Sequence, residues 1–383
     1  MAQPLYDLSP ALRLMLMAAT LALGPLAWVW LRNQQDSGGR RMQALTLLTL
    51  FLTFDLVLFG AFTRLTDSGL GCPDWPGCYG SATAIGAHAQ IEQAQTAMPT
   101  GPVTHAKAWI EMVHRYLAMA VGVLIATLAA AGWLRRRRGD PLNPWWPTIT
   151  LAWVCLQGAF GALTVTMKLF PAIVTLHLLG GMVLLALLCR QAVAWNRASR
   201  TAAAVAIAPG MRAWLLAAFA LVWLQIALGA WVSTNYAVLA CSEFPKCQGS
   251  WWPPMDFRQG FEIWRGLGMT GAGEHIAFPA LTAIHFAHRL VAYAVLAVLA
   301  FVAWQLRQRG VLSAQAKWLG ALIAWQFATG VSNVVLGWPL VAAVSHTGGA
   351  AALVLVLTWA LCASARSSAT ARAARLDGRR VAT

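Results

Sequence analysis

Nine apolar stretches, each long enough to cross a bilayer, dominate this sequence of 383 residues. A transmembrane helix needs about 20 mostly apolar residues. Charged residues make up only 11% of the chain, whereas a soluble domain carries roughly 25%. The sequence therefore predicts an all-α polytopic membrane protein. The expected spans are 11–31, 42–63, 108–134, 147–167, 171–193, 212–234, 278–304, 315–336 and 340–363.

Arginines in the short loops predict how the chain is oriented. Basic clusters follow the first, third, fifth, seventh and ninth apolar stretches, and basic loops stay on the cytoplasmic side. We therefore expect a periplasmic N-terminus, a cytoplasmic C-terminus and two long outer loops at about 64–107 and 235–277. Because membrane orientation explains the net charge of +15, we expect the lipid bilayer, and no nucleic acid, as a partner.

An internal repeat divides the chain. Gly60 precedes Cys72 by twelve residues, and Gly229 precedes Cys241 by the same interval. Each of these cysteines is followed six residues later by another, Cys78 or Cys247, and then by a long outer loop. Self-similarity of this kind indicates duplicated structural units.

The second part of each unit repeats as well. Gln157 precedes His177 by twenty residues, as Gln326 precedes His346. Units of four helices keep one orientation, so the repeat is parallel about an axis along the membrane normal. We expect two parallel-repeat four-helix bundles plus one extra N-terminal transmembrane helix. The predicted divisions are 1–41 (the extra helix and its cytoplasmic loop), 42–200 and 201–365 (the two halves) and 366–383 (a basic cytoplasmic tail).

Four histidines lie in apolar helices at repeat-related positions: His114, His177, His288 and His346. In each half, two histidines lie roughly 9 Å below the outer end of their helices at 1.5 Å per residue. Imidazole pairs at matched depth suit axial ligation of a haem. A single membrane histidine often only hydrogen-bonds a neighbouring helix, but packing gives no reason to duplicate it. A zinc site is disfavoured, because the loop cysteines lie apart from these histidines.

The two halves differ three residues before the first histidine. Glu111 precedes His114 on one helical face, and His285 precedes His288. An intramembrane carboxyl group is costly and indicates function. Glu111 is therefore the candidate catalytic residue, as a base or as a stabiliser of positive charge. The alternative is that Glu111 only pairs with Arg115 one turn later.

Both cysteine pairs lie on the predicted oxidising side, where disulfides persist. We expect the disulfides Cys72–Cys78 and Cys241–Cys247. The second is interpreted as a loop staple, and the first as either a staple or a redox-active pair. The remaining loop histidines are expected to be solvated and not to be ligands: His88, His105 and His275.

The run TRLTDSGLGCPDWPGCYG (63–80), followed by EMVHRY, TLHLLGG and HFAHRL, resembles the haem A synthase family of bacteria and mitochondria. The resemblance covers about 42–363. Members have eight helices in two halves, so the first helix here is an addition. The resemblance implies oxidation of the C8 methyl group of haem O to a formyl group, giving haem A for cytochrome oxidase assembly.

Site roles also follow from the resemblance. His114 and His177 are implied as ligands of the substrate haem O, with Glu111 essential nearby, and His288 and His346 as axial ligands of a haem b cofactor. The cysteines Cys72 and Cys78 match the family's outer-loop pair. Implied partners are haem O synthase (the protohaem farnesyltransferase) and cytochrome oxidase assembly factors. Without an apparent mitochondrial transit peptide, the expected location is a bacterial cytoplasmic (inner) membrane.

Two other functions compete with this one. A di-haem b electron-transfer cytochrome with a quinone partner would use the same four histidines, but it would not need a carboxyl group in one half only. A transporter would more often show helices broken near mid-membrane, whereas the polar residues here cluster towards the outer ends. The asymmetry at Glu111 therefore favours an enzyme acting on haem.

Overall fold

The computed structural model describes residues 9–34, 38–139, 143–200 and 204–366. Within these ranges nine helices are long and apolar enough to cross a membrane, as the sequence predicted. They are α1 (Ser9–Arg32), α2 (Gly38–Leu65), α4 (His105–Arg137), α5 (Trp145–Thr166), α6 (Pro171–Arg200), α7 (Pro209–Thr234), α9 (Phe278–Gln308), α10 (Ser313–Val335) and α11 (Leu340–Ala363). The shorter elements are α3 (His88–Ala97), the 3₁₀ helix η1 (Ala237–Ala240), α8 (Phe257–Gly260), β1 (Val205–Ile207) and β2 (Ser364–Arg366).

Three threonines inside the α2 span find hydrogen-bond partners within their own helix. Thr46, Thr49 and Thr53 of α2 each donate their hydroxyl to the carbonyl four residues earlier, at 2.7–2.8 Å. Hydroxyl groups satisfied in this way are compatible with an apolar surrounding. Proline begins α6 and α7, where its fixed φ favours the first helical turn and its missing N–H costs nothing.

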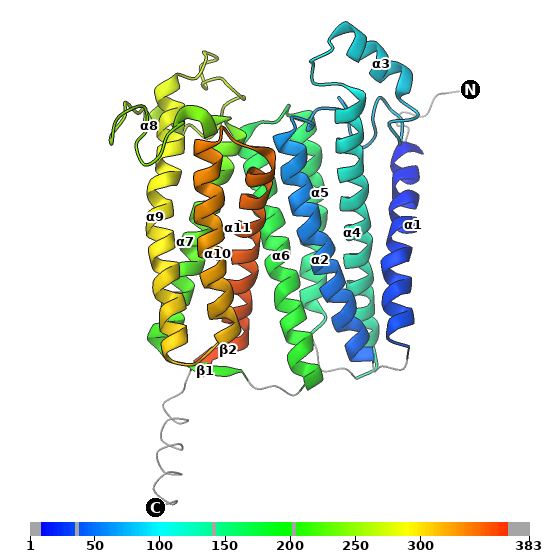
Figure 1. The fold of residues 1–383 in the computed structure, drawn as a ribbon. Helices are drawn as coiled ribbons and strands as arrows, with labels where there is room; N and C mark the ends of the chain where they lie inside the picture. Colours follow the sequence, from blue (N-terminus) through cyan, green and yellow to red (C-terminus); the bar gives the residue numbers. More distant parts are fainter. Residues whose placement is uncertain (1–8, 35–37, 140–142, 201–203, 367–383) are drawn as a thin grey trace, which may run out of the picture.

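The helices form two bundles side by side (Figure 1). One contains α2, α4, α5 and α6, and the other contains α7, α9, α10 and α11. Helices α2 and α6 of the first bundle pack against α11 of the second, and α6 also packs against α7. The first helix, α1, lies outside this arrangement and packs mainly on α4. It buries Leu14, Ala18, Ala22 and Val29, and the small residues allow close helix approach.

Residues at equivalent repeat positions meet where the halves join. Arg64 donates through Nη2 to the carbonyl of Ser233 at 2.6 Å, and the Tyr236 hydroxyl donates to Asp67 at 2.5 Å. Each pair is separated in sequence by the same interval as Cys72 and Cys241. Burial raises the pKa of Tyr236, which keeps its phenol protonated as the donor. Contacts between equivalent positions are the mark of a two-fold relation.

A short parallel β-pair closes the second bundle at the end that lies away from the two long loops. β1 follows the boundary between the halves, β2 follows α11, and Val205 pairs with Ser364. Arg212 reinforces the pair by donating through Nη1 to the carbonyls of Leu361 and Ser364, both at 3.3 Å. The predicted tail beyond Arg366 lies outside the described residues.

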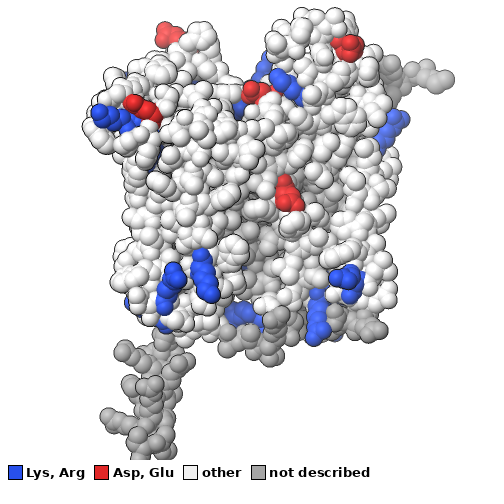
Figure 2. Space-filling view, viewed as in Figure 1, with Lys and Arg blue, Asp and Glu red and all other residues white. Residues whose placement is uncertain are grey.

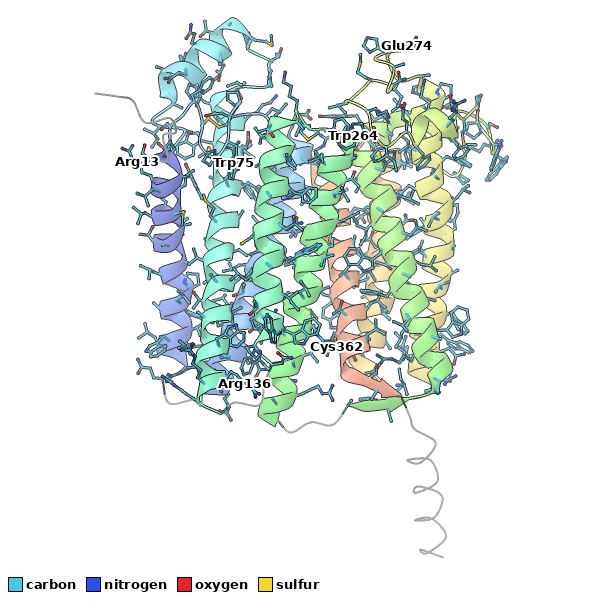
Figure 3. The ribbon with its side chains drawn as sticks, turned by 180° about the vertical axis from the view of Figure 1, so that it is seen from behind. Arg13, Trp75, Arg136, Trp264, Glu274 and Cys362 are labelled. Atoms are coloured by element: carbon cyan, nitrogen blue, oxygen red, sulfur yellow. A yellow bond between two sulfur atoms is a disulfide. The ribbon has the colours of Figure 1, made fainter. Side chains whose placement is uncertain are left out.

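Both long loops lie at one end of the molecule, called here the loop end, which carries α3, η1 and α8 (Figure 1). Trp75 and Trp264 mark this end in Figure 3, and Arg136 and Cys362 mark the opposite end. On the face drawn in Figure 2, the loop end carries both acidic and basic residues, one acidic residue lies near mid-height, and the opposite end carries Lys and Arg without Asp or Glu. The basic residues of the opposite end are the ones from which the orientation was predicted, and the orientation itself stays a prediction.

Candidate functional site

Two histidines of the first half pack against glycines of neighbouring helices. A Cβ atom added at Gly60 of α2 would lie 3.1 Å from Cε1 of His114 on α4. One added at Gly161 of α5 would lie 3.5 Å from Cε1 of His177 on α6. His177 is close enough to His114 to interact with it electrostatically. The structure thus brings together the two histidines that the sequence pairs in this half.

The second half repeats the arrangement. A Cβ atom at Gly229 of α7 would lie 2.8 Å from Cε1 of His288, and one at Gly330 of α10 would lie 3.3 Å from Cε1 of His346. The two imidazole centroids are 6.5 Å apart, with planes at 80°. Imidazole nitrogens bind metals such as zinc at about 2.0–2.1 Å, so this separation leaves room for one ion between the rings. The residues present fit axial ligation of a haem iron.

The second pair also has polar side-chain partners. Thr329 Oγ1 lies 2.9 Å from Nδ1 of His346 and donates its own proton to the Trp325 carbonyl at 2.7 Å. Its oxygen is therefore left to accept from Nδ1–H, which leaves Nε2 of His346 with a lone pair for a metal. The amide nitrogen of Gln225 donates to the His288 carbonyl at 3.1 Å and lies 3.0 Å from Nδ1 and 3.3 Å from Nε2 of the same residue.

The first pair lacks such partners. The positions equivalent to Gln225 and Thr329 hold Leu56 and Phe160. Among the described residues, Nδ1 of His114 and Nδ1 of His177 have no hydrogen-bond partner. Aligning the repeats position by position would have exposed this difference in the sequence. Its meaning depends on the contacts, which the sequence does not give.

Glu111 is buried beside His114, and each of its carboxylate oxygens has a partner. Oε1 accepts from Arg115 Nη2 at 2.5 Å, and Oε2 accepts from the Cys72 backbone N–H at 2.8 Å. The ion pair with Arg115, raised above as the alternative role, is therefore present. The bond to Cys72 also ties the carboxylate to the disulfide loop, so its position is fixed from two sides. His285 is buried at the matching place in the other half.

The arginine after each first histidine holds the disulfide loop of its half. Arg115 Nη1 donates to the carbonyls of Asp74, Pro76 and Gly77 at 3.0, 3.2 and 2.5 Å. Charged donors make stronger hydrogen bonds than neutral ones. The loop is therefore held against the side of α4 by Arg115.

Arg289 donates to the three equivalent carbonyls of the second half, those of Glu243, Pro245 and Lys246, at 3.1, 3.3 and 2.9 Å. Each loop is closed by a disulfide, Cys72–Cys78 or Cys241–Cys247. The two loops are thus the same structure built twice.

Two histidines that were expected in a loop lie in helices instead. His88 begins α3 and His105 begins α4, because α4 starts three residues earlier than the apolar pattern suggested and the loop contains a helix of its own. Glu92 lies 2.8 Å from His105. His275 lies exposed in the loop before α9, as expected.

Taken together, these features define a multi-pass membrane protein with two fused four-helix units, each holding paired histidines below a disulfide-closed loop. Residues 43–358 match the sequence model of the COX15-CtaA family, described as cytochrome oxidase assembly protein. The chain belongs to this family.

Curated relatives are similar to this chain in sequence over nearly their whole length. A protein of Shewanella oneidensis named "Heme A synthase" is 37% identical over 326 residues, which cover 82% of this chain and 95% of the relative. Proteins with the same name from Halalkalibacterium halodurans and Caulobacter vibrioides are 28% and 29% identical, over 80% of this chain and 90% and 91% of the relatives.

Proposed function

We propose that this protein is a haem A synthase, a membrane enzyme that oxidises the C8 methyl group of haem O to a formyl group. The observation that carries the proposal is the unequal pair of histidine sites in a chain of this family. Both halves bring two imidazoles together, and only the first has a carboxyl group three residues before its first histidine. The names of its relatives support the same activity.

In this proposal the second half keeps a resident haem b and the first half takes the substrate. His288 and His346 are the axial ligands of the haem b. The hydrogen bond from His346 Nδ1–H to the Thr329 oxygen favours retention, because such partners fix the tautomer and raise ligand basicity. His114 and His177 hold the iron of haem O. Imidazoles whose Nδ1 atoms have no hydrogen-bond partner suit a haem that must arrive and leave.

The catalytic carboxylate of the proposal is Glu111. Bound haem iron supplies the redox chemistry that side chains perform poorly. Glu111 stabilises positive charge that develops at the methyl carbon during its oxidation, an effect that a poorly solvated site strengthens. Arg115 and the Cys72 N–H hold the carboxylate in one orientation, so little reorganisation is needed.

Location and partners belong to the same proposal. We place the protein in a bacterial inner membrane with the loop end towards the periplasm, because the opposite end carries the basic short loops. Haem O synthase would supply the substrate, and cytochrome oxidase assembly factors would receive the product. The orientation is tested by labelling loop cysteines with an impermeant thiol reagent, before and after reduction, in intact cells.

Expression in a bacterium that makes haem O but lacks its own haem A synthase tests the activity. Haems extracted from the membranes should include haem A when the wild-type chain is present. His114→Ala should leave haem O unconverted while the haem b spectrum of the second half remains. Membranes that contain the folded, haem-loaded chain and still make no haem A would refute the proposal and favour an electron-transfer cytochrome.

A further inference from the structure

Three potential metal ligands from two helices meet at the loop end, apart from the four membrane histidines. They are His88 and Glu92 of α3 and His105 of α4, and their ligand atoms all lie within 4.8 Å of one another. His105 Nε2 is 2.8 Å from Glu92 Oε2, and the rings of His88 and His105 have centroids 4.5 Å apart. The function proposed above uses none of these side chains.

The backbone that presents them is held by other contacts. His88 and Glu92 are four residues apart and therefore share one face of α3. Ile91, on the same helix, is fully buried against the core of the first half. Gln95 accepts a hydrogen bond from the His105 backbone N–H at 2.9 Å, which joins α3 to the start of α4. The three ligands are therefore gathered without help from an ion.

The donor set indicates which ion would fit. Two imidazoles and one carboxylate are typical ligands of zinc and similar divalent ions, and three protein ligands leave a fourth position for water. Exposure favours access to an ion from solution, since Glu92 is 58% exposed and His105 28% exposed. Magnesium and calcium are disfavoured, because they prefer oxygen ligands.

We propose that His88, Glu92 and His105 form a binding site for one divalent transition-metal ion of the zinc class. The ion would replace the hydrogen bond between His105 and Glu92 and join α3 to the first residue of α4. Glu111 and His114 lie six and nine residues further along the same helix. Binding therefore braces the loop end of the first half, and the second half has no counterpart among the described residues.

Zinc titration of the full-length, haem-loaded protein tests the site. The protein is purified with a tag that lacks histidine, treated with a chelator and titrated with zinc sulfate by calorimetry. Bound zinc is then measured by elemental analysis, with haem iron as the internal standard. We expect one strong zinc site per chain in the wild type, and zinc should also raise the melting temperature.

Variants separate the proposed site from other zinc-binding groups. His88→Ala and Glu92→Gln should each weaken zinc binding by more than the ~10–100-fold cost of losing an outer-shell partner, with the haem spectrum unchanged. His275→Ala is the matched control, because His275 is an exposed loop histidine of the other half, and it should bind zinc as the wild type does. Wild-type affinity in both triad variants, or no zinc bound by the wild-type protein, would show that Glu92 and His105 form only a hydrogen bond.

Discussion

Arg115 and Arg289 hold two nearly identical disulfide loops through equivalent backbone carbonyls, yet the residues beside the histidines differ between the halves. The first half has Glu111 and two histidines without Nδ1 partners. The second has His285 in place of the carboxyl group and polar side chains on both ligand candidates. The two halves thus share one frame but differ in the side chains around each histidine pair, and the proposed function assigns retention to one site and reaction to the other.

The largest effect is expected from substitutions that test whether the second half retains haem. His288→Ala or His346→Ala should abolish the low-spin b-type spectrum of the purified protein, because axial ligation needs both imidazoles. Visible spectroscopy of the membrane-inserted protein measures this. His275→Ala should leave the spectrum intact. An unchanged spectrum in both ligand variants would show that His288 and His346 do not hold haem b, and the proposed difference in haem retention between the halves would fail.

Arg115→Leu should destabilise the protein more than Arg289→Leu. The first change leaves the buried Glu111 carboxylate without its charge partner, which typically costs about 3–5 kcal/mol. Both changes also remove three hydrogen bonds from a charged donor to backbone carbonyls, worth about 1.5–3 kcal/mol each. The cost of the unpaired carboxylate is therefore an additional loss that only Arg115→Leu carries. Denaturation of both variants in detergent compares them. Equal losses in the free energy of unfolding would mean that the Glu111–Arg115 ion pair adds no stability beyond that of the loop hydrogen bonds, which both halves share.

Glu111→Gln should lower conversion of haem O to haem A by about 10²–10³-fold, because it removes one preorganised electrostatic interaction. Haem b in the second half should stay bound. The ratio of haem A to haem O extracted from cells measures the effect, and His285→Gln at the matching position is the control. If the Glu111 variant kept the wild-type ratio, the carboxylate would be only the ion-pair partner of Arg115.

The smallest effect concerns the histidine partners. Thr329→Val keeps the shape of the side chain and removes the acceptor for His346 Nδ1, so haem b should be lost about 10–100-fold more readily. Competition with a haem-scavenging protein measures the change. Ser332→Ala on the same helix removes a hydroxyl that bonds only the Ala328 carbonyl and should have no effect. The reciprocal Phe160→Thr should slow haem release from the first half.

Repeated spacing made the frame of this protein predictable. The nine spans follow from apolar length, and the equal intervals around Cys72 and Cys241 predict the duplicated loops before any contact is seen. The four histidines could be found for the same reason. Their neighbours could not, because Thr329 is one hydroxyl among many in apolar helices until its distance to His346 is known.

The cluster of His88, Glu92 and His105 shows a second limit of prediction from the sequence. His88 and Glu92 have helical spacing, but α3 is too polar to stand out by apolar periodicity. His105 lies beyond a turn that contains Gly101 and Pro102. Only the packing of α3 on α4 brings the third ligand to the first two.

The parallel pairing of β1 with β2 has a consequence for how the chain is made. Val205 leaves the ribosome long before Ser364, its partner in the pair. The first bundle and its loop can therefore assemble while the second is still being synthesised, and the second stays open at this end until its last helix has inserted. A chain cut before Ser364 would lack the closure altogether, whereas a reporter fused beyond Arg366 would leave the pair intact.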